Sequence, residues 1–169
     1  MSSIVAIMSQ PIILITFYSR CGSTEKLALA AAVGAVQGRA LIRLRRLPDV
    51  EEFSGCKETL DRMHREYVAP READILGADA LVLAAPAGFS TSSPEWSGYF
   101  NLLTKLRSEG KLERKVGAVV DCGDESTLVS FSTAIDKLGL VAVSHERDAT
   151  SQGRTVAAAA RALKQATGG

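Results

Sequence analysis

The sequence predicts an α/β protein in which a parallel sheet carries helices on both faces. The clearest strands, 12–18 and 79–85, are continuous apolar runs, as expected of strands buried on both faces of a parallel sheet. Strands and helical patterns alternate along the chain, which favours βαβ units. Three loops of small residues each follow a strand and precede a helix. Together these observations predict a doubly wound sheet.

In the first half, alanines at helical spacing predict a helix over 24–36 after the opening strand. Residues 40–44 predict a second strand at the edge of the sheet. Four arginines alternate there with apolar residues, and exposed charges discourage edge-to-edge pairing. These arginines are Arg39, Arg43, Arg45 and Arg46. A charged helical stretch is expected at 58–67 and a short turn at 72–76.

In the second half, the buried strand at 79–85 leads through a small-residue loop to a helix over 95–106. A fourth strand is expected at 116–120, a helix at 127–138 and a fifth strand at 140–143. An alanine-rich final helix is expected at 154–165, beginning just after Gly153. No internal repeat or interdomain linker is visible.

Length and charge limit the possible classes of protein. The 169 residues fit one domain over 1–169, in which 1–11 form a tail that leads into the first strand. A formal net charge of +1 does not indicate a nucleic-acid partner. The first ten residues have no Lys or Arg before a short apolar patch, so we expect neither a signal peptide nor a membrane span.

The cysteines and histidines give no pattern typical of a metal site. Cys21, Cys56 and Cys122 form no CxxC motif, and such a sparse, odd set predicts a reducing, cytoplasmic compartment. His64 and His145 are far apart in sequence, which argues against a zinc site or a Ser-His-Asp triad. We expect Cys122 to be a small buried thiol and His145 to be a loop residue.

The first loop, 19–24, has the composition of a phosphate site. Ser19, Ser23 and Thr24 supply hydroxyls, Gly22 allows a tight backbone, and the next helix directs its positive end at the same spot. The alternative is an ordinary N-capped helix without a ligand. Three hydroxyls around one glycine favour the phosphate.

Other phosphate motifs can be excluded. The chain has no G-x-x-x-x-G-K-[ST] and no G-x-G-x-x-G after the first strand. A phosphatase with Cys21 as nucleophile needs an arginine six positions later, where this chain has Leu27. The loops at 18–24, 86–94 and 121–126 all follow strands, so they are expected to converge on one ligand at the carboxyl edge of the sheet.

Residues 18–28, YSRCGSTEKLA, resemble the FMN-phosphate loop of flavodoxins, and more closely that of the multimeric flavodoxin-like quinone reductases, the WrbA family. Residues 86–101 lie where that family carries its second flavin loop, and 78–86 lead into it in the family manner. The resemblance extends to 153–157 and covers most of the chain. It implies a flavodoxin-like five-stranded parallel sheet of order 2-1-3-4-5.

The resemblance also implies a flavin site built from all three loops, with Phe89 against the ring. The loop expected to hold the FMN phosphate comprises Ser19, Arg20, Cys21, Gly22, Ser23 and Thr24. The loop expected to line the isoalloxazine and ribityl groups comprises Pro86, Ala87, Gly88, Phe89, Ser90 and Thr91. The loop expected to close the far side comprises Asp121, Cys122, Gly123 and Asp124. No catalytic residue is assigned, because the flavin would carry the chemistry.

The activity implied is two-electron reduction of a quinone by NAD(P)H, in a homodimer or homotetramer. Two alternatives stay open. A flavodoxin-type electron carrier typically has an acidic docking surface, which the near-neutral charge disfavours. A relative that has lost FMN is favoured by Ser90-Thr91 in place of the family's Gly-Asn, by a short third loop, and by the absence of a histidine in the second half of the site. Trp96 is expected to be a packing or subunit-contact residue rather than a ring stacker.

Overall fold

Five parallel strands form the centre of the molecule. The structure, a computed structural model, describes residues 10–166; most of the expected N-terminal tail, residues 1–9, lies outside them. The strands are β1 (Ile12–Phe17), β2 (Leu41–Arg46), β3 (Ala80–Ala84), β4 (Val116–Val119) and β5 (Val141–Ala142). Their order is β2-β1-β3-β4-β5, and every pairing is parallel, which confirms the predicted sheet.

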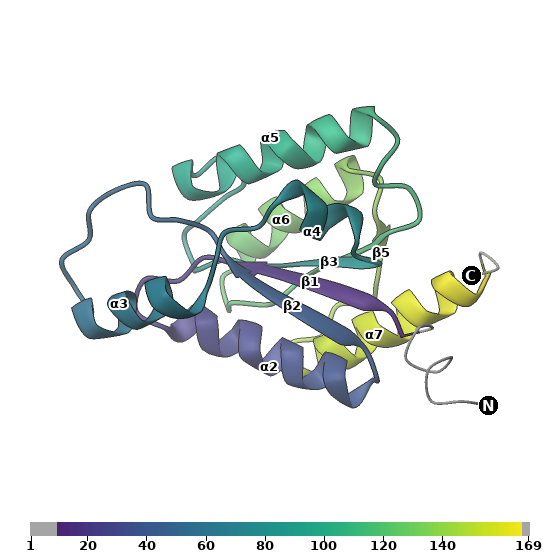
Figure 1. The fold of residues 1–169 in the computed structure, drawn as a ribbon, viewed down its shortest axis with the longest axis horizontal. Coiled ribbons are helices and arrows are strands. Elements are labelled where there is room, and N and C mark those ends of the chain that lie inside the picture. The colour runs from purple at the N-terminus through teal and green to yellow at the C-terminus, as the bar shows by residue number, and fades with distance from the viewer. Residues whose placement is uncertain (1–9, 167–169) are drawn as a thin grey trace.

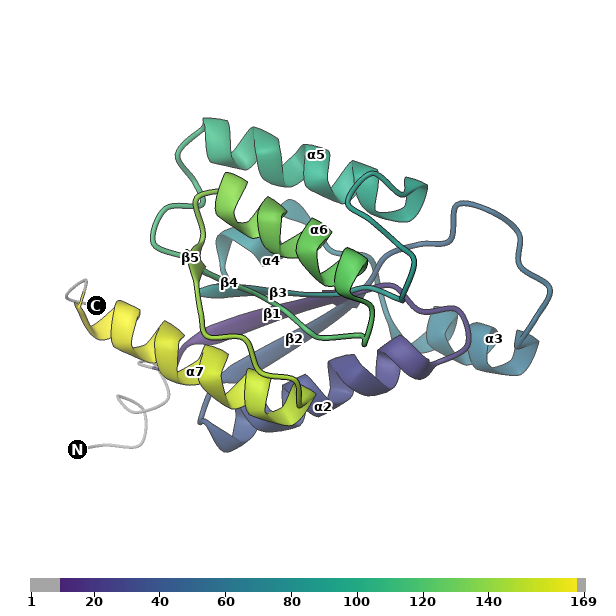
Figure 2. The same cartoon turned by 180° about the vertical axis from the view of Figure 1, so that it is seen from behind.

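Helices cover both faces of this sheet (Figures 1 and 2). One face carries α2 (Ser23–Gln37), α3 (Lys57–Glu66) and α7 (Ala149–Ala166). The other carries α4 (Glu72–Leu76), α5 (Pro94–Ser108) and α6 (Glu125–Lys137). Side chains of β1 alternate between the two cores: Ile13 and Ile15 face the α2–α7 layer, and Leu14 faces the α5–α6 layer.

Helices α2 and α7 approach each other through glycines. A Cβ atom added at Gly34 would lie 1.8 Å from the carbonyl oxygen of Thr150, and one at Gly153 would lie 2.0 Å from that of Ala31. No side chain fits at either position, so the two backbones are in direct contact. Gly153 is therefore a packing residue inside the last helix.

The predicted start of the last helix, just after Gly153, was wrong. Helix α7 begins at Ala149 rather than at 154 because Asp148 caps it: Oδ2 of Asp148 accepts the backbone N–H and the hydroxyl of Ser151, each at 2.9 Å. Strand β5 is also shorter than expected and is exposed at both residues. None of the helices within residues 10–166 is long and apolar enough to cross a membrane.

Candidate functional site

The loops that follow β1, β3 and β4 meet at the carboxyl edge of the sheet. The rings of Tyr18, after β1, and Phe89, after β3, are 5.5 Å apart. The backbone N–H of Gly88 donates to Oδ2 of Asp124, after β4, at 3.0 Å. The first loop therefore contacts the second, and the second contacts the third, as expected from the order of their strands.

The first loop is compact and ends at the start of α2. Gly22 has φ +99°, a conformation that favours glycine, and occupies the N-cap position; no side chain in residues 10–166 caps this helix. Its N–H donates to the hydroxyl of Ser19 at 3.0 Å. Ser19 and Thr24 are both buried. The positive end of the helix therefore faces the first loop, in which Ser19 Oγ accepts the N–H of the cap residue Gly22.

A buried arginine supports this loop from β2. Arg46 is only 5% exposed, and its Nη2 donates to the carbonyl oxygen of Ser19 at 2.7 Å and to Asp49 at 3.0 Å. The prediction that Arg46 lies on the exposed side of an edge strand was therefore wrong. The strand is at the edge of the sheet, but its last residue, Arg46, has a buried side chain that contacts the first loop.

Asp49 joins three donors beside this loop. Its carboxylate accepts hydrogen bonds from Arg46, from the Tyr18 hydroxyl at 2.7 Å, and from His64 Nε2 at 2.7 Å. Burial alone would raise the pKa of Asp49, but these hydrogen bonds outweigh it and lower the pKa to about 2.

Asp49→Asn is expected to destabilise the protein at pH 7 and to have little effect near pH 2. A lowered carboxyl pKa contributes stability above its unfolded value near 4, and this contribution is lost as pH falls toward about 2. The full shift corresponds to roughly 2.4 kcal/mol, which solvent screening reduces to about 1 kcal/mol. Urea unfolding at several pH values measures it, with the exposed Asp61→Asn on α3 as control. An equal loss at both pH values would contradict this role.

Glu25, in the first turn of α2, is a buried acid whose charge is paired. It accepts Arg62 Nη2 at 2.6 Å and Arg62 Nη1 at 2.9 Å, and the Tyr67 hydroxyl at 2.6 Å. The hydrogen bonds from Arg62 contribute most to lowering the pKa of Glu25. This cluster docks α3 on α2, and it compensates a negative charge next to the first loop.

The second loop is held against α6. The Gly88 N–H donates to the Thr127 hydroxyl at 3.0 Å as well as to Asp124, and the Thr91 N–H donates to Ser130 Oγ at 3.2 Å. Asp124 also accepts the Thr127 hydroxyl, and this bond contributes most to lowering the pKa of Asp124. The carboxylate therefore stays ionised while it fixes the base of the loop.

The third loop contacts a histidine from the segment between β5 and α7, which sequence reasoning did not place there. Nε2 of His145 lies 3.0 Å from Oδ2 of Asp121, whose Oδ1 accepts the Gly123 N–H at 2.8 Å. The expectation that the second half of the site lacks a histidine was wrong, although His145 does lie in a loop. Cys122 is half-buried rather than buried, and it forms no disulfide within the described chain.

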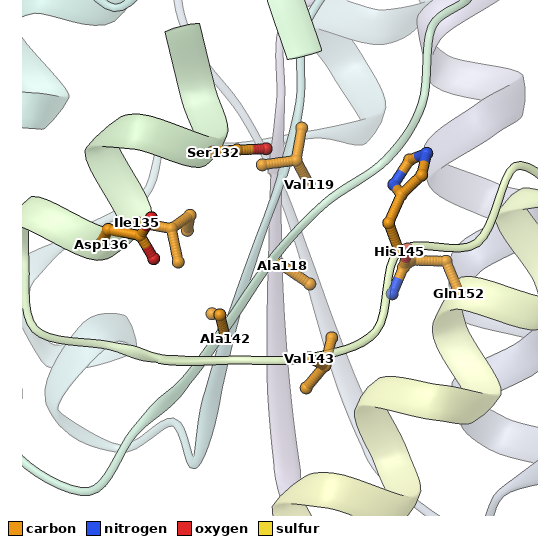
Figure 3. Close-up of a pocket in the computed structure, with 10 residues that line it drawn as sticks. Ala118, Val119, Ser132, Ile135, Asp136, Ala142, Val143, His145 and Gln152 are labelled. Atoms are coloured by element: carbon orange, nitrogen blue, oxygen red, sulfur yellow. The ribbon is translucent and has the colours of Figure 1, made fainter. Parts of the chain in front are cut away.

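His145 lines two neighbouring hollows. One cavity of about 160 Å³ lies between β4, β5 and α6, and Figure 3 shows His145 and Gln152 facing Ala118 and Val119 across it. A larger polar cleft of about 680 Å³ runs along the third loop and also includes Arg147. The third loop therefore borders space large enough for a small organic molecule.

Aromatic rings line the junction of the first two loops. The Arg20 guanidinium carbon lies 5.8 Å from the Tyr18 ring centre, 5.6 Å from that of Phe89 and 5.2 Å from that of Phe53. Trp96 is fully buried and packs 4.8 Å from Phe131, which confirms the expected packing role. Phe89, the aromatic residue predicted for the site, is half-buried.

Comparison with known proteins gives the family. No family model matches the chain. The chain is 30% identical over 143 residues to NAD(P)H dehydrogenase (quinone) of Archaeoglobus fulgidus, an alignment that covers 78% of this chain and 74% of that protein. The chain belongs to the flavodoxin-like, WrbA-type NAD(P)H dehydrogenase (quinone) family. A relative from Rhizobium meliloti, NAD(P)H dehydrogenase (quinone) 3, is 29% identical over 136 residues, covering 77% of this chain and 64% of the relative. The chain thus spans about two thirds to three quarters of these relatives.

Solved structures agree on the fold. A WrbA-like flavodoxin from Agrobacterium tumefaciens superposes with a TM-score of 0.62 at 17% identity, covering 90% of this chain and 99% of the other. A Streptococcus flavodoxin gives 0.58 at 17% identity, covering 89% and 98%. At these identities the likeness shows the fold of the family and not the ligand.

This member of the family has one feature that its cysteine count did not predict. Cys21, in the first loop, and Cys56, at the N-terminus of α3, form a disulfide with Cα atoms 5.4 Å apart. The sequence predicted no pairing among the three cysteines, and the structure pairs two of them. The two cysteines are 35 residues apart with no motif spacing, and only the fold brings α3 beside the first loop.

Proposed function

We propose that this chain binds FMN and transfers two electrons from NAD(P)H to a quinone. The observation that carries the proposal is the first loop, in which Gly22 adopts φ +99° at a helix N-terminus without a side-chain cap in residues 10–166. Such a loop offers backbone N–H groups and a positive helix end to a phosphate. The names of the relatives support the choice of substrates.

The first loop suits the phosphate in charge and in shape. Hydroxyls of Ser19, Ser23 and Thr24 supply further donors, and Glu25 does not repel the anion strongly because Arg62 and Tyr67 pair with its carboxylate. Arg46 donates a hydrogen bond to the Ser19 carbonyl oxygen, which compensates part of the negative charge on that oxygen. In this proposal residues 19–24 are the phosphate clamp.

The second and third loops suit a flat ring. Gly88 and Gly123 have φ of +88° and +87°, and a Cβ at either position would meet no atom of the described residues within 4 Å. The backbone of both loops therefore borders open space that side chains do not fill. We assign residues 86–91 and 121–124 to the two sides of the isoalloxazine, with Phe89 against the ring.

The bound flavin would supply the hydride acceptor and donor, and the protein's residues would position the ring and control charge. Asp124 fixes the Gly88 backbone, and Asp121 orients His145 toward the polar cleft along the third loop. Two acidic side chains beside a ring that becomes anionic on reduction would disfavour the reduced form, and so favour electron transfer onward to the quinone. Oligomerisation to a dimer or tetramer stays a prediction.

Anaerobic stopped-flow absorbance tests this function. FMN-loaded protein is expected to lose its flavin absorbance on mixing with NADH or NADPH alone, and a simple benzoquinone is expected to restore it. A one-electron carrier would not accept hydride directly. Loading without reduction by either nucleotide would favour the carrier, and failure to load would favour a relative that has lost FMN.

A further inference from the structure

The Cys21–Cys56 disulfide lies at the outer edge of the first loop. Cys21 stands between Arg20 and Gly22, and Cys56 closes the loop 48–56 that runs from the end of β2 to α3 (Figure 1). We propose that this disulfide is a site of reversible thiol–disulfide exchange that fixes loop 48–56 against residues 19–24. Reduction frees loop 48–56 and lowers the affinity of the first loop for a phosphate.

Both half-cystines are accessible to a reductant, because Cys21 and Cys56 are exposed. A dithiol is the chemical class that reacts at such a site. One thiolate attacks a sulfur of the disulfide and forms a mixed disulfide, which releases the other cysteine. The second thiol of the reagent then releases the remaining cysteine. The reagent leaves as a disulfide, and two electrons and two protons have passed to Cys21 and Cys56.

Reduction is expected to leave α3 in place. The helix is docked by Arg62, whose hydrogen bonds to Glu25 of α2 are 2.6 and 2.9 Å long, and by the buried side chains of Leu60 and Met63. Tyr67, just after the helix, adds a hydrogen bond to Glu25. These contacts do not involve the disulfide, so α3 is expected to stay docked when the bond is reduced.

Loop 48–56 has much less to hold it. Asp49 anchors its beginning through Arg46, Tyr18 and His64, but beyond it Val50 is 56% exposed and Phe53 is 36% exposed. Phe53 contacts the first loop through the guanidinium of Arg20 at 5.2 Å. Cys56 itself has φ +56°, an uncommon conformation for a residue with a side chain. Once the covalent bond is broken, Cys56 can leave this conformation and the loop can move away.

The effect on the first loop follows from the position of Cys21. A crosslink at Cys21, which lies between Arg20 and Gly22, limits the conformations of the segment that would bind the phosphate. Preorganisation of this kind strengthens binding. This consequence rests on the proposed function. The opening of loop 48–56 does not, so the two can be tested separately.

Thiol counting and limited proteolysis test the opening. The denatured, unreduced protein is expected to show one reactive thiol and the reduced protein three. Protease Glu-C is expected to cut after Glu51 or Glu52 at least about fivefold faster in reduced than in oxidised protein. Cuts after Glu109 and Glu113, between α5 and β4, serve as the internal reference. Three thiols without reductant, or equal cutting of loop 48–56, would overturn the proposal.

Two variants separate the disulfide from general effects of reductant. Glu-C is expected to cut Cys56→Ser as fast as the reduced wild-type protein, with or without dithiothreitol. Cutting of Cys122→Ser is expected to respond to dithiothreitol as in the wild type. FMN titration then tests the link to the ligand: the dissociation constant is expected to rise about fivefold on reduction. An unchanged constant would refute the link. If FMN binds in neither state while loop 48–56 still opens on reduction, the proposed function fails and the exchange site stands.

Discussion

Gly153→Ala is expected to lower the free energy of unfolding by about 3 kcal/mol. The new Cβ would lie 2.0 Å from the Ala31 carbonyl oxygen, and the neighbouring atoms are backbone that cannot rotate away. Helices α2 and α7 would have to separate, which would loosen the packing around Ala157 and Val156, both fully buried. The gain in helix propensity from glycine to alanine, about 1 kcal/mol, does not compensate for this. Urea denaturation followed by circular dichroism measures the change.

Gly98→Ala is the matched control. Gly98 also lies inside a helix, α5, but it is exposed, and a Cβ there would meet no atom of the described chain within 4 Å. This substitution is expected to stabilise the protein by about 0.5–1 kcal/mol. Equal effects of the two substitutions would show that helix propensity, and not the contact between α2 and α7, determines the result.

Gly22→Val is expected to weaken FMN binding by at least about 100-fold, or roughly 2.7 kcal/mol. A β-branched residue is strained at φ +99°, and the added Cβ would lie 3.3 Å from Thr59 Cγ2. The first loop would then have to move, and its N–H groups would no longer converge on the phosphate. Quenching of FMN fluorescence on binding measures the dissociation constant.

Gly110→Val controls for backbone strain alone. Gly110 has φ +74° in the turn between α5 and β4, at the edge of the sheet opposite the three loops. Gly110→Val is expected to lower the free energy of unfolding, as backbone strain does in Gly22→Val, but to keep wild-type affinity for FMN. Equal loss of affinity in both variants would contradict a specific role for Gly22.

The sheet could be predicted from sequence because its signal is local. The runs at 12–17 and 80–84 are apolar at every position but Thr16, and turn residues mark where each ends. The family resemblance then supplied the strand order. The loops of the candidate site could be located for the same reason, since each follows a strand.

What could not be predicted depends on contacts across the fold. Arg46 looks like any edge-strand arginine until the first loop is placed above it. His145 reaches Asp121 across 24 residues, and Cys21 reaches Cys56 across 35. The start of α7 is different, because Asp148 and Ser151 carry a local cap signal that was overlooked in favour of Gly153.

Comparing FMN with riboflavin tests the central claim most directly. The two ligands share the isoalloxazine ring and the ribityl chain and differ only in the phosphate that residues 19–24 are proposed to hold. Titration of the purified protein with each is expected to show FMN binding at least about 100-fold tighter. Equal affinities, or no binding of FMN at all, would contradict a phosphate clamp at the start of α2.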